Sequence, residues 1–123
     1  MRVAILVVSI FGLLSGCSNH DEIIEDAEAA LSENLKDPES LKTRAVRAMD
    51  RETDNGSITI VCGEFDAKNS YGGYTGYEPF AYIDRTGIGG DSDVYETSGL
   101  SDEEEVIGLA LIHRLCEGDG TEA

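Results

Sequence analysis

The sequence predicts an α+β fold in which a small antiparallel sheet is packed by an N-terminal and a C-terminal helix. Apolar residues recur at helical spacing near both ends of the chain, over residues 22–36 and from residue 101 onward. Between them, residues 57–65 and 78–84 alternate in the way that is typical of strands. A disulfide between Cys62 and Cys116 would connect the best of these strands to the second helix.

Residues 1–16 have the layout of a secretory signal peptide. Arg2 is followed by an apolar run over residues 3–14 and by two small residues ahead of Cys17. The run has about twelve residues, whereas a helix that crosses a bilayer needs about twenty. A transmembrane helix is therefore the weaker interpretation.

The segment Leu14-Ser15-Gly16-Cys17 resembles the lipobox of bacterial lipoproteins. The resemblance implies that residues 1–16 are removed and that acyl chains such as palmitate on Cys17 hold the protein on a membrane. Ser18 at the next position implies sorting to the outer membrane, on the periplasmic side. An ordinary signal peptide with a chance cysteine is the alternative. Residues 17–21 would form a short lipidated tether, and residues 22–123 one small domain.

The chain is strongly acidic. It has 25 Asp and Glu against 9 Lys and Arg, for a net charge of −16, and loss of Arg2 with the signal peptide would make it −17. Such a charge repels nucleic acid, so we expect no nucleic-acid partner. A basic protein partner and an acidic surface suited to a salty habitat both remain open.

Cys62 and Cys116 remain as an even pair once Cys17 is lipidated, and an oxidising compartment favours a disulfide between them. The closed loop of 55 residues would contribute on the order of 4 kcal/mol. A reactive thiol beside His113, three residues before Cys116, is the alternative.

The remaining elements follow from local signals. The first helix should end before Pro38, because a residue that precedes proline avoids the helical region, and Asp37 with Pro38 should then open one short turn. A strand over residues 43–49 should form a hairpin with residues 57–65, and residues 85–99 should be a loop rich in Gly and Asp. Ser101 with Glu104 forms a capping box for the second helix, which Gly118 should end. This helix is apolar nearly all round, so we expect it to be the central buried one.

The candidate binding site is the Gly/Tyr-rich loop that follows the best strand. Its glycines permit backbone angles closed to other residues, and we expect a positive φ at Gly73 or Gly76. Tyrosines on such a loop suit recognition, but they also suit packing between strands. The two polar residues of the loop, Lys68 and Asn69, could bind a ligand or form hydrogen bonds to the loop's own backbone. The candidate binding residues are Lys68, Asn69, Tyr71, Tyr74 and Tyr77.

The central part of the chain resembles a group of small bacterial secreted or lipid-anchored proteins. The resemblance rests on Asp37-Pro38-Glu39-Ser40 and on the later segments Val61-Cys62-Gly63-Glu64, Ala67-Lys68-Asn69 and Gly72-Gly73-Tyr74, which match a pattern like DPxSxxFR followed by VCGxxNAKNxxGGYxG. The chain departs from it at Thr43, where the pattern has Phe, and at Asp66, where it has Asn. The resemblance supports the fold and implies no activity.

Catalytic, cofactor and metal motifs are absent from the sequence. It contains no GxSxG, no P-loop and no His/Cys cluster, and the carboxylates of residues 50–54 depart from a calcium loop at two positions. Asp91 and Asp93 could bind a cation weakly, although solvated loop charge is the better interpretation. We therefore expect a non-catalytic envelope lipoprotein that binds a protein or cell-wall component through the tyrosine loop. The alternative is an inhibitor or immunity protein against a basic wall-degrading enzyme or toxin, and an enzyme is a third possibility.

Overall fold

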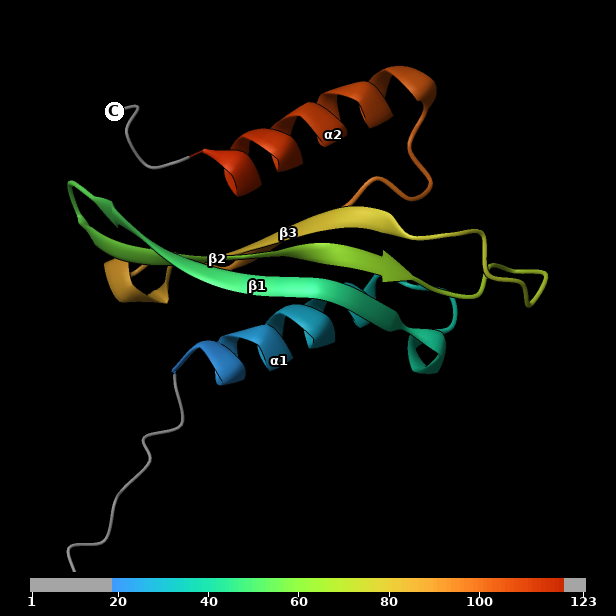
Figure 1. The fold of residues 1–123 in the computed structure, drawn as a ribbon, viewed down its shortest axis with the longest axis horizontal. Helices are drawn as coiled ribbons and strands as arrows, with labels where there is room; N and C mark the ends of the chain where they lie inside the picture. The colour runs from blue at the N-terminus through green and yellow to red at the C-terminus, as the bar shows by residue number, and fades with distance from the viewer. Residues whose placement is uncertain (1–18, 119–123) are drawn as a thin grey trace, which may run out of the picture.

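A four-stranded antiparallel sheet lies between two helices in the computed structural model, which describes residues 19–118 (Figure 1). The strands follow one another in the order β1-β2-β3-β4, and the predicted fold class is confirmed. The predicted signal peptide, Cys17 and Ser18 lie outside the described residues. The elements in chain order are α1 (Asn19–Glu33), η1 (Pro38–Ser40), β1 (Lys42–Thr53), β2 (Gly56–Asp66), β3 (Glu78–Asp84), η2 (Thr86–Ile88), β4 (Asp93–Tyr95) and α2 (Asp102–Glu117).

The two faces of the sheet each carry a hydrophobic cluster, because successive side chains of a strand point to opposite faces. On one face, Val61 and Phe80 pack against Leu31 and its neighbours on α1. On the other face, Ile60 and Ala81 pack against Ile112 of α2 and its neighbours. Both clusters lie within residues 19–118, so a chain that starts at Ser18 contains every packing contact of the described fold.

Helix α1 begins and ends three residues earlier than the sequence predicts. Its first turn includes Asp21 and Glu22, whose carboxylates suit the positive end of the helix dipole, so the helix takes up part of the predicted tether. At its end, Leu35 continues the packing of the cluster after the helix has stopped. The apolar spacing therefore extends beyond the helix itself.

Strands β1 and β2 form the predicted hairpin, but β1 is longer than predicted and contains a β-bulge. The pairing register shifts between Arg44 and Arg47, and Ala45 between them has a φ of 52°. A bulge bends its strand and increases the local twist. Alternation in the sequence is poor over this part of β1, and the bulge is the reason.

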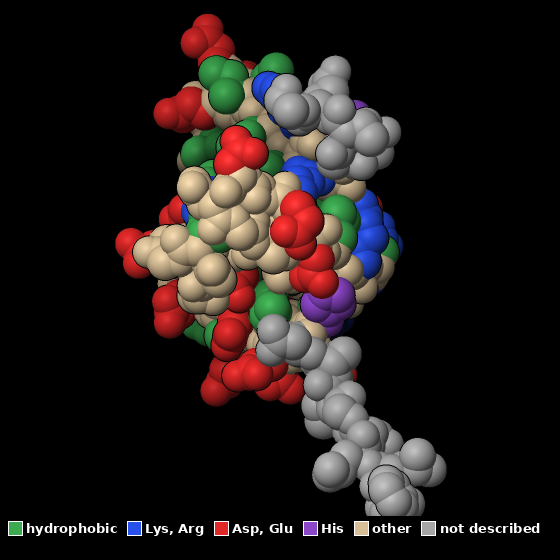
Figure 2. All heavy atoms as spheres, turned by 90° about the vertical axis from the view of Figure 1, so that its left-hand side faces the viewer, with side chains coloured by type: hydrophobic (Ala, Val, Ile, Leu, Met, Phe, Trp, Pro, Cys, Tyr) green, Lys and Arg blue, Asp and Glu red, His purple; other side chains and the backbone are tan. Residues whose placement is uncertain are grey.

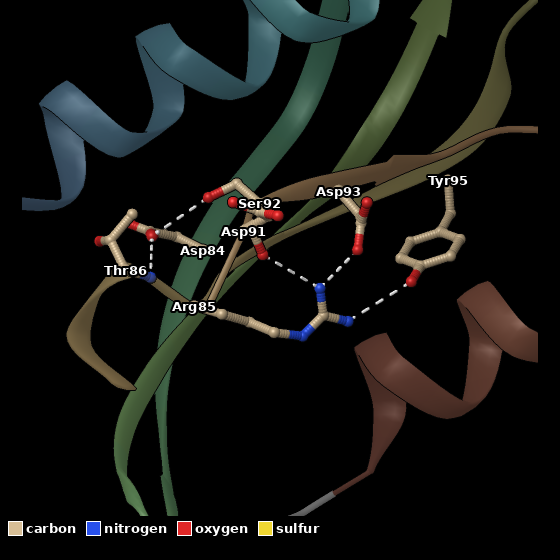
Figure 3. Close-up of polar contacts among 7 residues, drawn as sticks. All are labelled: Asp84, Arg85, Thr86, Asp91, Ser92, Asp93 and Tyr95. Atoms are coloured by element: carbon tan, nitrogen blue, oxygen red, sulfur yellow. Dashed lines mark hydrogen bonds and ion pairs between the residues drawn. The ribbon is translucent and has the colours of Figure 1, made fainter. Parts of the chain in front are cut away.

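A short fourth strand, β4, lies within the predicted loop over residues 85–99. Arg85 holds it against β3: its Nη1 donates to Asp93 Oδ2 at 2.6 Å and to the Asp91 carbonyl at 3.3 Å, and its Nη2 donates to Tyr95 Oη at 3.4 Å (Figure 3). Asp93 is thus an ion-pair partner of Arg85. Among the described residues no group of three or more His, Cys, Asp or Glu side chains could hold a metal ion.

Helix α2 begins with the predicted capping box of Ser101 and Glu104, and Gly118 is its C-cap. The expectation that it is the central buried helix is wrong. It is an outer layer on one face of the sheet (Figure 1), and only Ile112 among its residues is buried. A helix that covers one face of a sheet can bury only one side of itself, however apolar its other side is.

The predicted disulfide between Cys62 of β2 and Cys116 of α2 is confirmed, with 5.9 Å between the two Cα atoms. It joins the sheet to the outer helix through the second cluster. In the described part of the chain, no helix is both long enough and apolar enough to span a membrane.

Candidate tyrosine-loop site

The loop between β2 and β3 is bonded at its base to the turn formed by η1. The side chain of Ser40 is buried; its Oγ donates to the Asp37 carbonyl at 2.7 Å and accepts the Lys68 backbone N–H at 2.8 Å. The Ser40 carbonyl accepts the Tyr74 hydroxyl at 2.9 Å. Residues 37–40 and 67–74, which are separate in the sequence resemblance, therefore form one hydrogen-bonded unit.

Asn69 shapes the tip of the loop. Its Oδ1 accepts the backbone N–H groups of Tyr71 at 3.0 Å and Gly73 at 3.2 Å, while its backbone N–H donates to the Gly73 carbonyl at 2.9 Å. An asparagine side chain often closes a turn in this way. Asn69 could bind a ligand or the loop's own backbone, and in the structure its side-chain carbonyl bonds the backbone.

The expectation of a positive φ at Gly73 or Gly76 is confirmed by Gly76, with a φ of 117°, while Gly73 has no positive φ. Gly72 has the second positive φ in the loop, 78°. A Cβ on Gly73 would meet only Asn69 Oδ1, at 3.9 Å.

The three tyrosines occupy different surroundings. Tyr71 is 97 % exposed at the tip, whereas Tyr74 is 38 % and Tyr77 37 % exposed against β1. Tyr71 is therefore the member of the set that is available to a partner at no cost in packing. The other two combine packing with partial exposure.

Cations from β1 lie on the rings of the two partly buried tyrosines. Lys42 Nζ lies 4.0 Å from the centroid of Tyr74, and Arg44 Cζ lies 3.8 Å from that of Tyr77. Lys68 Nζ also approaches Tyr74, at 5.9 Å from the centroid. We call this set the basic–aromatic surface; its members are Lys42, Arg44, Lys68, Tyr74 and Tyr77.

Basic residues concentrate along β1 in this otherwise acidic protein. Figure 2 shows most of the visible Lys and Arg side chains gathered along one side of the molecule, with Asp and Glu over much of the remaining face. Arg47 Nη2 donates to the Cys116 carbonyl, and Arg51 Nη2 donates to the carbonyls of Leu115 and Gly118 at the end of α2. These two arginines therefore support the helix end. Beside the loop, Arg44 is ion-paired with Glu64, whereas Lys42 and Lys68 take part in no ion pair among residues 19–118.

A pocket of about 290 Å³ lies beside the loop. Among the groups that line it are two carboxylates, two ammonium groups and apolar surface; these residues are Asp66, Glu78, Lys36, Lys68, Leu35 and Phe65. Burial raises the pKa of Glu78, and the nearby carboxylates of Glu96, Glu105 and Asp66 raise it further. The pocket thus combines a partly buried carboxylate, which has other carboxylates nearby, with two lysines.

Sequence reasoning found the loop but missed the pocket and the cations from β1. The residues that line the pocket come from the segment after α1, from β2, β3 and the loop, and from the segment before α2, so no single stretch contains them. A local signal did exist for the cations, because Lys42 and Arg44 are two positions apart and therefore share one face of a strand.

The tyrosine loop, the basic–aromatic surface and the adjoining pocket lie together in the fold as one candidate site. No protein-family model, curated protein or solved structure matches the chain. The function must therefore be inferred from the site itself.

Proposed function

We propose that this protein is a small acidic lipoprotein of the cell envelope that acts as a non-catalytic binding module. In this proposal, Cys17 carries the acyl chains, and the tyrosine loop with its pocket binds the ligand. The observation that supports the proposal most is the coexistence of the exposed Tyr71 with a firmly bonded loop base at Ser40. A ring held out on a pre-organised loop gives contact area at a small cost in entropy.

The position of the loop suits a lipid anchor at Cys17. The anchor would lie two residues before the start of α1, and the loop between β2 and β3 lies at the opposite end of the sheet from that start (Figure 1). A protein tethered through Cys17 to the periplasmic face of the outer membrane would then direct the loop away from the bilayer. This favours a ligand in the periplasm over one in the membrane.

The pocket favours a ligand that carries both charges. Burial raises the pKa of Glu78, and the nearby carboxylates raise it further; an ammonium group of a ligand beside Glu78 would favour its charged form. Lys36 and Lys68 complement a carboxylate of the same ligand. The cross-linking peptides of the bacterial cell wall carry amino and carboxyl groups within a few bonds of each other, so we favour a cell-wall peptide over a folded protein.

Co-sedimentation with purified peptidoglycan tests this proposal. Tyr71→Ala and Lys68→Glu should each weaken binding at least tenfold without a change in melting, whereas Tyr71→Phe and Lys68→Arg, which keep the ring and the charge, should bind nearly as wild type does. Binding that is equal in all four variants, or no binding by the wild type, would contradict the proposed site.

The anchor has its own test. Cys17→Ser should move the protein from the membrane fraction to the soluble fraction, and mass spectrometry of the wild-type N-terminal peptide should find the acyl chains. Unchanged fractionation without an acyl mass would remove the lipoprotein part of the proposal and leave the binding site untouched.

A second candidate function rests on a different surface. The outward side of α1 carries the exposed carboxylates of Asp21, Glu22, Glu25, Asp26 and Glu33. An acidic surface speeds encounter with a basic partner, and this gain fades as salt screens it. An inhibitor or immunity protein would therefore capture a basic envelope enzyme or toxin in a salt-sensitive way that Tyr71→Ala leaves unchanged.

A further inference from the structure

Helix α2 presents an apolar face to the outside of the molecule. Val106 is 68 % exposed, Ile107 70 % and Leu111 40 %, and Ala110 between them is exposed as well. The helix is the outermost layer on its side of the sheet, so nothing in the described part of the chain covers this face (Figure 1). Val106, Ile107 and Leu111 are adjacent on one helix of a strongly acidic protein, so this face is a candidate interface.

The order of residues along the face is complementary to itself when reversed. The central stripe is Glu103, Ile107, Ala110 and Arg114, with the spacing of four, three and four residues that is typical of a two-helix seam. The stripe is symmetric about the peptide bond between Gly108 and Leu109. An antiparallel copy of the helix, related by a two-fold axis at that level, would place Ile107 opposite Ala110 and Glu103 opposite Arg114.

We propose that a second copy of this chain covers the face, as a homodimer through antiparallel α2 helices. A two-fold contact uses one surface patch twice, so this self-complementary stripe is sufficient for both subunits. Val106 and Leu111 flank the stripe on its two sides and extend the apolar contact. The large Ile107 side chain meets the small Ala110 of the other copy, which lets the two helices approach closely.

The charges at the two ends of the stripe favour this partner. Glu103 and Arg114 take part in no ion pair among residues 19–118, so each is available to its counterpart. The first turn of α2 carries four carboxylates, and the antiparallel arrangement brings this turn near Arg114 in the last turn of the other copy. An anionic lipid surface would instead meet those carboxylates with repulsion.

The interface is small. A contact between single helices lies below the area of about 1,200 Å² that characterises stable complexes, so the dimer should be weak and should need high protein concentration or co-localisation. Wild-type protein that starts at Ser18 should sediment as a monomer at a few micromolar and approach the dimer mass at several hundred micromolar. Ile107→Ser should remove this shift, and the melting of the monomer should stay the same because the side chain is exposed.

Charge reversal makes the test specific for the register. Glu103→Arg and Arg114→Glu should each weaken self-association about tenfold or more, because each places like charges opposite one another twice. An equimolar mixture of the two variants should associate as strongly as wild type, since both contacts are then opposite in sign, and the double variant should associate with itself.

Glu25→Arg on the exposed side of α1 makes the same change in net charge as Glu103→Arg, away from the interface, and serves as the matched control for that variant. It should not weaken association. A wild type that stays monomeric at every concentration would overturn the proposal, and so would a dimer that Ile107→Ser leaves intact. A mixture of the two charge variants that fails to associate would refute the antiparallel register.

Discussion

The removal of one hydroxyl group, in Ser40→Ala, should loosen the base of the tyrosine loop. The Oγ of Ser40 is buried and accepts the Lys68 backbone N–H at 2.8 Å, whereas the Asp37 carbonyl keeps a second donor, the Ser40 backbone N–H at 3.1 Å. The loss is therefore concentrated on one partly buried N–H group that has no partner left. Such a group costs about 1–3 kcal/mol, and we expect the free energy of unfolding to fall by about 2 kcal/mol.

Urea denaturation of the oxidised chain from Ser18 measures this loss, and hydrogen exchange of the Lys68 amide localises it. Ser70→Ala is the matched control, because its exposed hydroxyl accepts only from Lys36 Nζ and should change stability by less than about 0.5 kcal/mol. Tyr74→Phe, which removes the hydroxyl bonded to the Ser40 carbonyl, should cost about 1 kcal/mol. The reasoning is refuted if Ser40→Ala is as stable as Ser70→Ala and the Lys68 amide exchanges at its wild-type rate.

Four further outcomes follow from the backbone, the charges and the disulfide. Ala45→Gly should stabilise the protein by up to about 1 kcal/mol in urea melts, because the φ of 52° strains a residue with a Cβ and favours glycine; a loss of stability would contradict this. Gly76→Val should destabilise by on the order of 1–2 kcal/mol, since its φ is 117°, whereas Gly73→Val should be much milder, and equal costs would show that the positive φ is not the cause. Burial and neighbouring carboxylates raise the pKa of Glu78 above its usual 4.5, so the folded state binds this proton more tightly than the unfolded state does. Ionisation of Glu78 therefore destabilises the folded state. This loss of stability is absent below the pKa of Glu78 in the unfolded state and complete above its pKa in the folded state. Glu78→Gln should thus be more stable than wild type at pH 7 and not at pH 3. Reduction of the disulfide should lower stability by on the order of 4 kcal/mol, and a reduced protein that melts like the oxidised one would show that the bridge contributes little.

The sequence by itself determined the features whose causes are local. Alternation of apolar residues over β2 and β3 predicts strands with two apolar faces, and both clusters are built from these faces. The capping box at Ser101 and the stop at Gly118 predict the limits of α2. The pairing of Cys62 with Cys116 follows from the number of cysteines, because only two remain after Cys17 is set aside.

Only the tertiary structure decided which of these local surfaces meet. An apolar pattern all round α2 predicts burial, but one sheet face can cover only one side of a helix, so Ile112 is buried while Ile107 is exposed. The role of Ser40 depends on Lys68, 28 residues away, and on Tyr74, 34 residues away. No local pattern predicts such a contact, because its partners come together through the register of β1, β2 and β3. For the same reason, the sequence indicates a tyrosine loop, while the pocket beside it and the cations on its rings exist only in the folded chain.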